Sequence, residues 1–138
     1  MVVTRSVQLS TRGNGDMLDI TPQVAREVQQ SGVSSGIVTI FAPSATSGLT
    51  TIEYESGALA DLKHLFDEIV PEDGDYRHNL RWGDGNGHSH VRAALVGPSL
   101  TVPFTQGRLL LGTWQHVTYI DFDNRARRRE LVLQIMGE

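Results

Sequence analysis

The 138-residue sequence contains no cysteine, so it can form neither a disulfide bond nor a thiolate metal site. A metal ion would have to bind histidine, carboxylate or amide side chains. Positive charge is also scarce, because the formal net charge is −4 and Lys63 is the only lysine. The chain therefore has no general basic field that would attract nucleic acid or an anionic membrane surface. We expect neither of these as a partner.

Long apolar runs are missing as well. No segment approaches the ~18 apolar residues that a membrane-spanning helix requires, and the first residues lack the apolar segment of a secretory signal. The length and the 39% hydrophobic content fit a single domain over residues 1–138 with a core of its own. Because the lack of cysteine is compatible with a reducing compartment, we expect a cytoplasmic protein.

Hydrophobic periodicity predicts mostly strands. Apolar and polar residues alternate over 3–10, and residues 17–20 follow a Gly-Asn-Gly turn, so these two segments are predicted to form a hairpin. Residues 36–42 are rich in β-branched and aromatic side chains and predict a central buried strand. Further strand-like segments cover 49–55, 100–104, 109–122 and 130–136.

Three helices are predicted between these strands. The first starts at Thr21, with a proline in its first turn, and ends at Gly32. Apolar residues at helical spacing over 59–69 indicate the second, and residues 87–96 follow Asn86 as a suitable N-cap for the third. Residues 71–86 are expected to be irregular. The fold class is therefore α+β, a mainly antiparallel, β-sandwich-like sheet with about three helices.

One segment is dense in side chains that can coordinate a metal or transfer a proton. It contains His78, Asn79, Asp84, Asn86, His88 and His90. Imidazole can act as a metal ligand or as a general acid and base near neutral pH. Residues two apart on a helix point away from each other, so His88 and His90 cannot face one ion there, and His78 and His90 become the main candidates. The alternative is a solvated loop with incidental histidines and Asn86 as a simple helix cap.

Two further groups of residues are weaker candidates. Glu53 and Glu55 alternate along a strand that otherwise looks buried, which indicates a partnered carboxylate, although an edge strand with solvated glutamates explains them equally well. Ser44 and Thr46 can contact a phosphate, but no P-loop pattern is present. The arginines of 125–129 are expected to lie on a solvated hairpin or a charged edge strand, with a subunit or substrate-anion contact as the lesser alternative.

At several blocks the sequence resembles the YjbQ family. An Asn-x-x-x-His pattern runs from Asn86 to His90, and Leu-Gly-Thr-Trp-Gln follows at 111–115. Residues 50–55 and 76–79 match other family blocks in the same order, so the resemblance covers nearly the whole chain. Where many members have Pro-His-Thr-Thr, this chain has Ser44 at the histidine position, and any role of that imidazole is lost.

The resemblance implies a homotrimer of α+β subunits with a polar pocket near the subunit contacts, and a secondary thiamine-phosphate synthase activity. The family's polar positions fall on Glu53, His78, Asn86 and His90. A divalent metal, Mg²⁺ or Zn²⁺, is expected to be held by Glu53, His78 and His90. It would neutralise the diphosphate leaving group of a phosphorylated small-molecule substrate. Two alternatives are a non-catalytic trimer that binds metal or phosphate, and an oligomeric scaffold in which the polar face is structural.

Overall fold

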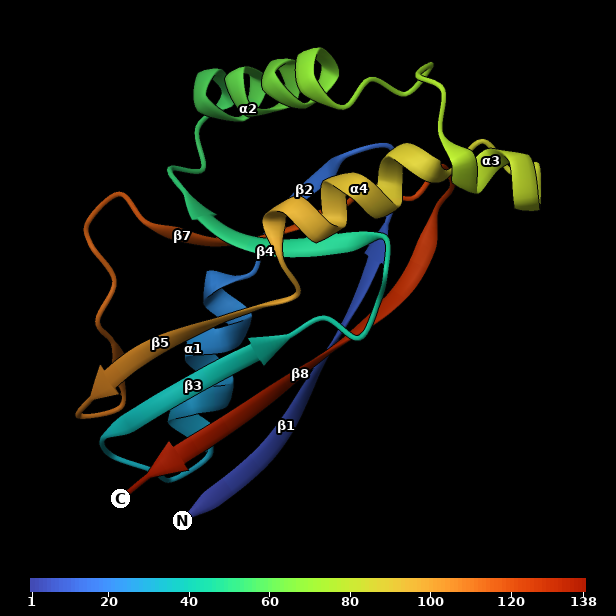
Figure 1. Cartoon of the computed structure of the whole chain (residues 1–138). Coiled ribbons are helices and arrows are strands. Elements are labelled where there is room, and N and C mark those ends of the chain that lie inside the picture. The colour runs from blue at the N-terminus through green and yellow to red at the C-terminus, as the bar shows by residue number, and fades with distance from the viewer.

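Two antiparallel sheets account for the β-structure of the chain (Figure 1). The structure is a computed structural model that describes residues 1–138. The five-stranded sheet has the order β1-β8-β3-β5-β6, with bounds β1 (Val2–Thr11), β8 (Arg127–Gly137), β3 (Gly36–Phe41), β5 (Ser99–Thr105) and β6 (Arg108–Leu109). The three-stranded sheet has the order β2-β7-β4, with bounds β2 (Asp16–Asp19), β7 (His116–Asp121) and β4 (Ser47–Ile52).

The main core forms where α1 (Thr21–Gln30) covers one face of the larger sheet (Figure 1). Val24 and Val28 stand one helical turn apart and are both fully buried. They belong to one apolar cluster with alternate residues of β3 and β8, such as Ile40 and Leu133, and with Tyr119 of the smaller sheet. The two sheets therefore share one apolar core.

A second, smaller apolar cluster attaches the remaining helices. Phe66 of α2 (Ser56–Ile69) packs edge-to-face on Phe122, with ring centroids 5.0 Å apart, and Ala93 of α4 (Gly87–Val96) joins them. α3 (Arg77–Trp82) buries no side chain. None of the four helices combines the length and the apolarity of a membrane span.

The α+β class with mainly antiparallel sheets is confirmed, and β3 is the central strand predicted for 36–42. Only one face of β3 is buried as predicted, because Ile37 and Phe41 on the other face are exposed. The predicted hairpin of 3–10 with 17–20 is wrong. All ten residues of β1 pair with β8, from Val2 opposite Met136 to Thr11 opposite Arg127, whereas β2 pairs with β7. The Gly-Asn-Gly turn carries the chain from one sheet to the other, because its N–H groups bond the carbonyls of Asp121 and Asp123.

Three element boundaries also differ from the predictions. The strand expected over 109–122 is interrupted between Leu109 and His116, where the backbone N–H of Gly112 bonds the Gln115 side chain instead of a neighbouring strand. β4 ends at Ile52, before both glutamates. The region 71–86 contains the helix α3, which has no apolar stripe and therefore no periodic signal in the sequence.

Candidate functional site

The turn between α3 and α4 sets the geometry of the candidate site. α3 ends at Gly83, whose φ of 64° lies in the left-handed region and lets the chain reverse. The Asp84 carboxylate then accepts a hydrogen bond from the Asn86 N–H at 3.2 Å. The Asn79 side-chain oxygen accepts one from the Gly87 N–H at 2.9 Å. The first bond shapes the turn, and the second holds the start of α4 against α3.

The same turn brings His78 of α3 and His90 of α4 face to face. Their ring centroids lie 4.3 Å apart, with the ring planes inclined by 39°, and both side chains are half-buried. His78 Nδ1 lies 3.5 Å from an oxygen of Asp84, which is an ion-pair distance when the imidazole is protonated. Two of the predicted site residues thus lie together beside a carboxylate, an arrangement suited to donating and accepting protons.

Asn86, four residues before His90, is only 7% exposed. It occupies the N-cap position of α4 but caps no backbone N–H with its side chain. Instead its side-chain oxygen accepts from the hydroxyl of Ser89, which is fully buried and also contacts the carbonyl oxygen of Phe122. Sequence reasoning missed Ser89, although its place three residues after Asn86 puts both on one helix face.

His88 faces away from His90, as expected for residues two apart on a helix. It is 3% exposed, with its ring 6.5 Å from that of Tyr76. Burial, followed by the charge of Arg92, lowers the pKa of His88 below its ordinary value. His88 is therefore a core histidine held in its neutral form, and treating it only as a marginal site residue overlooked its structural part.

The other two histidines lie outside this group. His64 is exposed on α2 and pairs with Glu68 at 2.9 Å. His116 accepts a hydrogen bond from the backbone N–H of Tyr54 at 3.0 Å and packs edge-on against its ring. This contact joins the start of β7 to the segment that follows β4.

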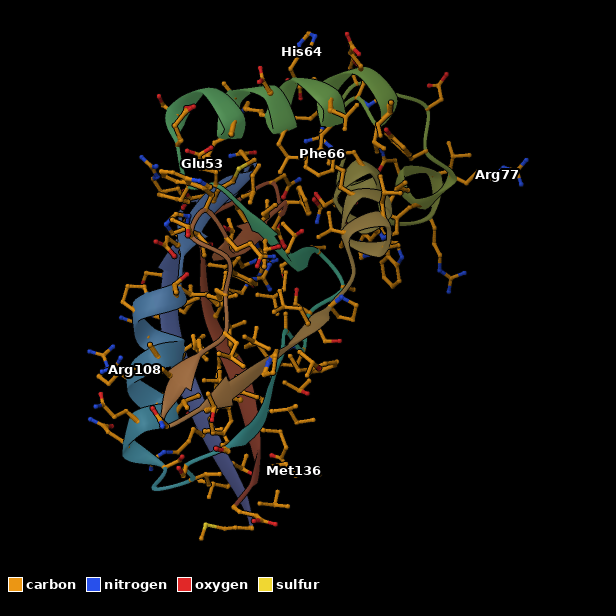
Figure 2. All side chains as sticks on the ribbon, turned by 90° about the vertical axis from the view of Figure 1, so that its left-hand side faces the viewer. Glu53, His64, Phe66, Arg77, Arg108 and Met136 are labelled. Carbon is orange, nitrogen blue, oxygen red and sulfur yellow. The ribbon has the colours of Figure 1, made fainter.

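The structure does not bring Glu53 to the histidine pair within one chain. Phe122 bonds the carbonyl of Thr46, just before β4, and also contacts Ser89 of α4, so the start of α4 lies near the start of β4. Glu53 follows the opposite end of this six-residue strand, which spans about 20 Å. Figure 2 shows Glu53 and the first residue of α3, Arg77, on opposite sides of the upper part of the molecule.

Both glutamates are exposed, so neither needs the buried partner that strand alternation suggested. The carboxylate of Glu55 accepts hydrogen bonds from the N–H groups of Gly57 and Ala58 and caps α2. A negative side chain is favourable at this end of a helix. The role of Glu55 is therefore structural.

No three histidine, aspartate or glutamate side chains of one chain lie close enough together to hold a metal ion. The expected ligand set of Glu53, His78 and His90 is split between two ends of β4. The two imidazoles stack at 4.3 Å instead of converging on a common point. Within one chain, these residues do not fit a divalent metal.

Ser44 and Thr46 use their polar groups inside the protein. The Ser44 hydroxyl accepts from the Thr46 N–H at 3.2 Å. The Thr46 hydroxyl donates to Asp123 at 3.1 Å and accepts from Arg129 at 2.9 Å, and Thr46 is buried. The loop therefore offers few free donors to a phosphate.

Thr46 belongs to a buried ionic network that the sequence did not reveal. Arg129 binds the fully buried Asp121 through two nitrogens, at 2.8 and 2.9 Å, and Thr11 donates to the same carboxylate at 2.6 Å. Burial alone would raise the pKa of Asp121, but the hydrogen bonds from Arg129 and Thr11 outweigh it and lower that pKa. Arg127 donates to one oxygen of the neighbouring Asp123 at 3.1 Å.

The solvated hairpin or edge strand predicted for the arginines of 125–129 is correspondingly wrong for two of them. β8 lies between β1 and β3, so it is an interior strand. Arg127 and Arg129 alternate on its inward side and bind the aspartates, whereas Arg128 points to the surface. Strand alternation was the available signal, since it places residues two apart on one face.

A cavity of about 390 Å³ adjoins α3. Tyr76, Arg77 and Asn79 line it, and the hydroxyl of Tyr76 is bonded to the carbonyl of Pro71. Asn79, which follows His78 in the chain, lines the cavity, but neither His78 nor His90 does. Its volume is within the range of small-molecule sites.

Comparison with known proteins covers almost all of the chain. Residues 5–138 match the family described as UPF0047 protein YjbQ-like. A UPF0047 protein of Methanothermobacter thermautotrophicus is 37% identical over 128 residues, which are 93% of this chain and 88% of the relative. The UPF0047 protein YugU of Bacillus subtilis is 34% identical over 96% of this chain and 98% of its own length.

Solved structures agree with this relationship. A protein from Sulfolobus solfataricus, described as YbjQ-like and of unknown function, superimposes with a TM-score of 0.94 at 30% identity, over 100% of this chain and 99% of the other. A YjbQ/UPF0047 protein from Clostridium acetobutylicum gives a TM-score of 0.87 at 33% identity, over 96% and 99%. The sequence matches and the shared fold together show that the chain belongs to the YjbQ/UPF0047 family.

Proposed function

We propose that this chain is an enzyme of phosphorylated small molecules, with the thiamine-phosphate synthase activity that the family resemblance implies. The observation that carries the proposal is the pairing of His78 with His90, 4.3 Å apart at the start of α4. A protonated imidazole beside a neutral one supplies an acid and a base in one place. The Asp84 carboxylate, 3.5 Å from Nδ1 of His78, is a group that can orient this ring.

The reaction requires one bond to form and one to break. The ring nitrogen of a thiazole phosphate attacks the methylene carbon of a hydroxymethylpyrimidine diphosphate. The C–N bond forms, the C–O bond to the diphosphate breaks, and its electron pair remains on the departing oxygen. One imidazolium of the pair donates its proton to that oxygen and becomes neutral. The first turn of α4, where His90 lies, favours the negative charge that develops there.

We assign no step to a metal ion. The expected Mg²⁺ or Zn²⁺ ligands Glu53, His78 and His90 do not converge in one chain. The residues that remain for charge neutralisation near α3 are cationic side chains such as Arg77, which lines the adjoining cavity.

The test is pyrophosphate release from the two phosphorylated precursors by purified wild type and by His78→Gln and His90→Gln. Loss of a general acid is expected to lower the rate by about 10²-fold or more in each variant. His64→Gln is the matched control, because His64 is exposed and pairs only with Glu68. Full activity in both site variants would refute the proposal. Tight binding of a precursor without release of pyrophosphate would favour the non-catalytic alternative.

We also propose that the chain assembles as a homotrimer. Several large apolar side chains on α3 and α4 lack cover, among them Leu80 at 88% and Trp82 at 65% exposure. Contiguous exposed apolar side chains are typical of protein interfaces. Sedimentation should give three times the 15.2 kDa mass of one chain, and Leu80→Ser combined with Trp82→Ser should reduce it. A monomeric wild type would contradict this part of the proposal.

A further inference from the structure

A second cavity, of about 480 Å³, lies between α2 and the turn that joins β1 to β2. α2 buries only Phe66, so most of its length stands off the sheets below it (Figure 1). The cavity wall on α2 is formed by Leu59, Ala60 and Lys63, and the opposite wall by the turn itself. Neither histidine of the α3–α4 pair belongs to its lining.

The turn is a rigid wall. Gly13, Asn14 and Gly15 all have positive φ, at 72°, 55° and 83°. The N–H of Asn14 bonds the carbonyl of Asp123 at 2.6 Å, and the N–H of Gly15 bonds that of Asp121 at 2.8 Å. The wall is thereby anchored to the buried ionic network. Since the N–H groups of Asn14 and Gly15 are already used, they do not serve as donors for an anion.

The floor is aromatic and apolar. The hydroxyl of Tyr54 donates to the carbonyl of Met17 at 2.6 Å, which links the segment before α2 to β2. With its hydroxyl fixed, the Tyr54 ring contributes its apolar body to the cavity together with Met17 and Leu59. Such a floor suits a flat, largely apolar group.

The rim is cationic. Asp16 is the only carboxylate in the lining, and it already accepts the N–H of Arg12 at 2.9 Å and its guanidinium at 3.4 Å. The guanidinium nevertheless remains largely exposed. Lys63, the only lysine of a chain with net charge −4, has no ion-pair partner. The lining therefore carries two cations and one carboxylate, and Asp16 offsets the charge of Arg12 while Lys63 has no opposite charge beside it.

From this arrangement we propose that the cavity between α2 and the β1–β2 turn binds a small aromatic anion, with Lys63 and Arg12 holding a phosphate or carboxylate and Tyr54 contacting the ring. The site is distinct from the α3–α4 site and goes beyond the proposed function. Cationic side chains bind such anions by charge-assisted hydrogen bonds, which are stronger than neutral ones.

The single lysine makes a direct test possible. Reductive ¹³C-methylation keeps the charge of Lys63 and gives one lysine side-chain NMR signal. Phenyl phosphate should shift this signal with saturation, and inorganic phosphate should bind about tenfold more weakly because it lacks the ring. Calorimetry should show that Lys63→Gln weakens phenyl phosphate binding by about tenfold or more.

Two matched variants keep the test specific. Arg26→Gln removes one exposed positive charge on α1, away from the cavity, and should leave the affinity unchanged. His90→Gln should also leave the affinity unchanged. This control makes a failure of the present proposal distinguishable from a failure of the function proposed for the α3–α4 site. Unaltered affinity in Lys63→Gln would overturn the proposal. Equal binding of inorganic phosphate would overturn the role of the ring, and equal weakening by His90→Gln would place the anion elsewhere.

Discussion

The ring of His78 lies 4.3 Å from that of His90, although the two residues belong to different helices. Their approach depends on how closely α3 and α4 meet. Gly87, the first residue of α4, sits where a Cβ atom would be 2.4 Å from the Cβ of Tyr76. Its N–H also donates to Asn79, the neighbour of His78. A hydrogen in place of a side chain is what allows the two helices to come together here.

Gly87→Ala should therefore destabilise the protein and separate the two histidines. Helix propensity alone favours alanine by about 1 kcal/mol, whereas overpacking against Tyr76 is expected to cost about 1–3 kcal/mol. Urea unfolding measures the net effect, and the NMR signals of His78 and His90 report on the pair. Gly57→Ala in the first turn of α2 is the control, since an added Cβ there would meet only the Glu55 carboxylate, a helix cap that can shift, and no packed ring. A Gly87→Ala protein more stable than wild type would refute the argument.

Ser89→Ala removes the hydroxyl that contacts Asn86 and the Phe122 carbonyl. Both contacts are buried, so the acceptors would lose their partner without gaining water. We expect the free energy of unfolding to fall by about 1–3 kcal/mol. Ser34→Ala, at an exposed position, should change it little. Equal stability of the Ser89→Ala and Ser34→Ala proteins would show that the hydroxyl has no such role.

Arg129→Gln should be among the most damaging single substitutions. It leaves the buried Asp121 without its main ion-pair partner, which typically costs about 3–5 kcal/mol. Because the pKa of Asp121 is lowered in the folded protein, its stabilising contribution is present above the ordinary value of 3.8 and is lost as the pH falls below it. The difference in the free energy of unfolding between wild type and Arg129→Gln should thus narrow as the pH falls below 3.8.

Arg128→Gln is the control for this pair, since Arg128 lies next to Arg129 on β8 but is exposed and has no ion-pair partner. Urea unfolding at neutral and acidic pH compares the three proteins. If Arg128→Gln and Arg129→Gln destabilise equally, the loss reflects net charge and not the buried network.

His88 should make the protein less stable as the pH falls through the range of histidine titration. Burial and the charge of Arg92 lower its pKa in the folded state, so below the ordinary value of 6.5 the unfolded chain takes up a proton that the folded chain resists. The free energy of unfolding then decreases with falling pH. In His88→Gln this contribution is absent. The difference in the free energy of unfolding between wild type and His88→Gln should therefore decrease as the pH is lowered from about 7.5 to about 5.5.

His64→Gln is the comparison, because exposed His64 lies in solvent beside Glu68. Unfolding curves for wild type and both variants over this pH range provide the measurement. An identical pH dependence in wild type and His88→Gln would show that His88 does not carry the effect.

Local pattern in the sequence determined the class of the fold and most of its elements. The β-branched run of 36–42 became β3, the spacing over 59–69 lies within α2, and the residues after Asn86 form α4. These features depend on neighbours within a few residues, so periodicity and capping are sufficient to predict them. The prediction that His88 and His90 face opposite ways has the same local basis.

Only the tertiary structure decided which strands pair and which polar residues meet. β1 pairs with β8, although the two strands lie at opposite ends of the sequence. Asp121 binds Arg129 only because β7 of the smaller sheet packs near β8 of the larger one. Glu53 lies apart from His78 because β4 ends before it and the chain then leaves along α2. Long-range pairing depends on how apolar faces from distant segments cover one another, and no local pattern records that choice.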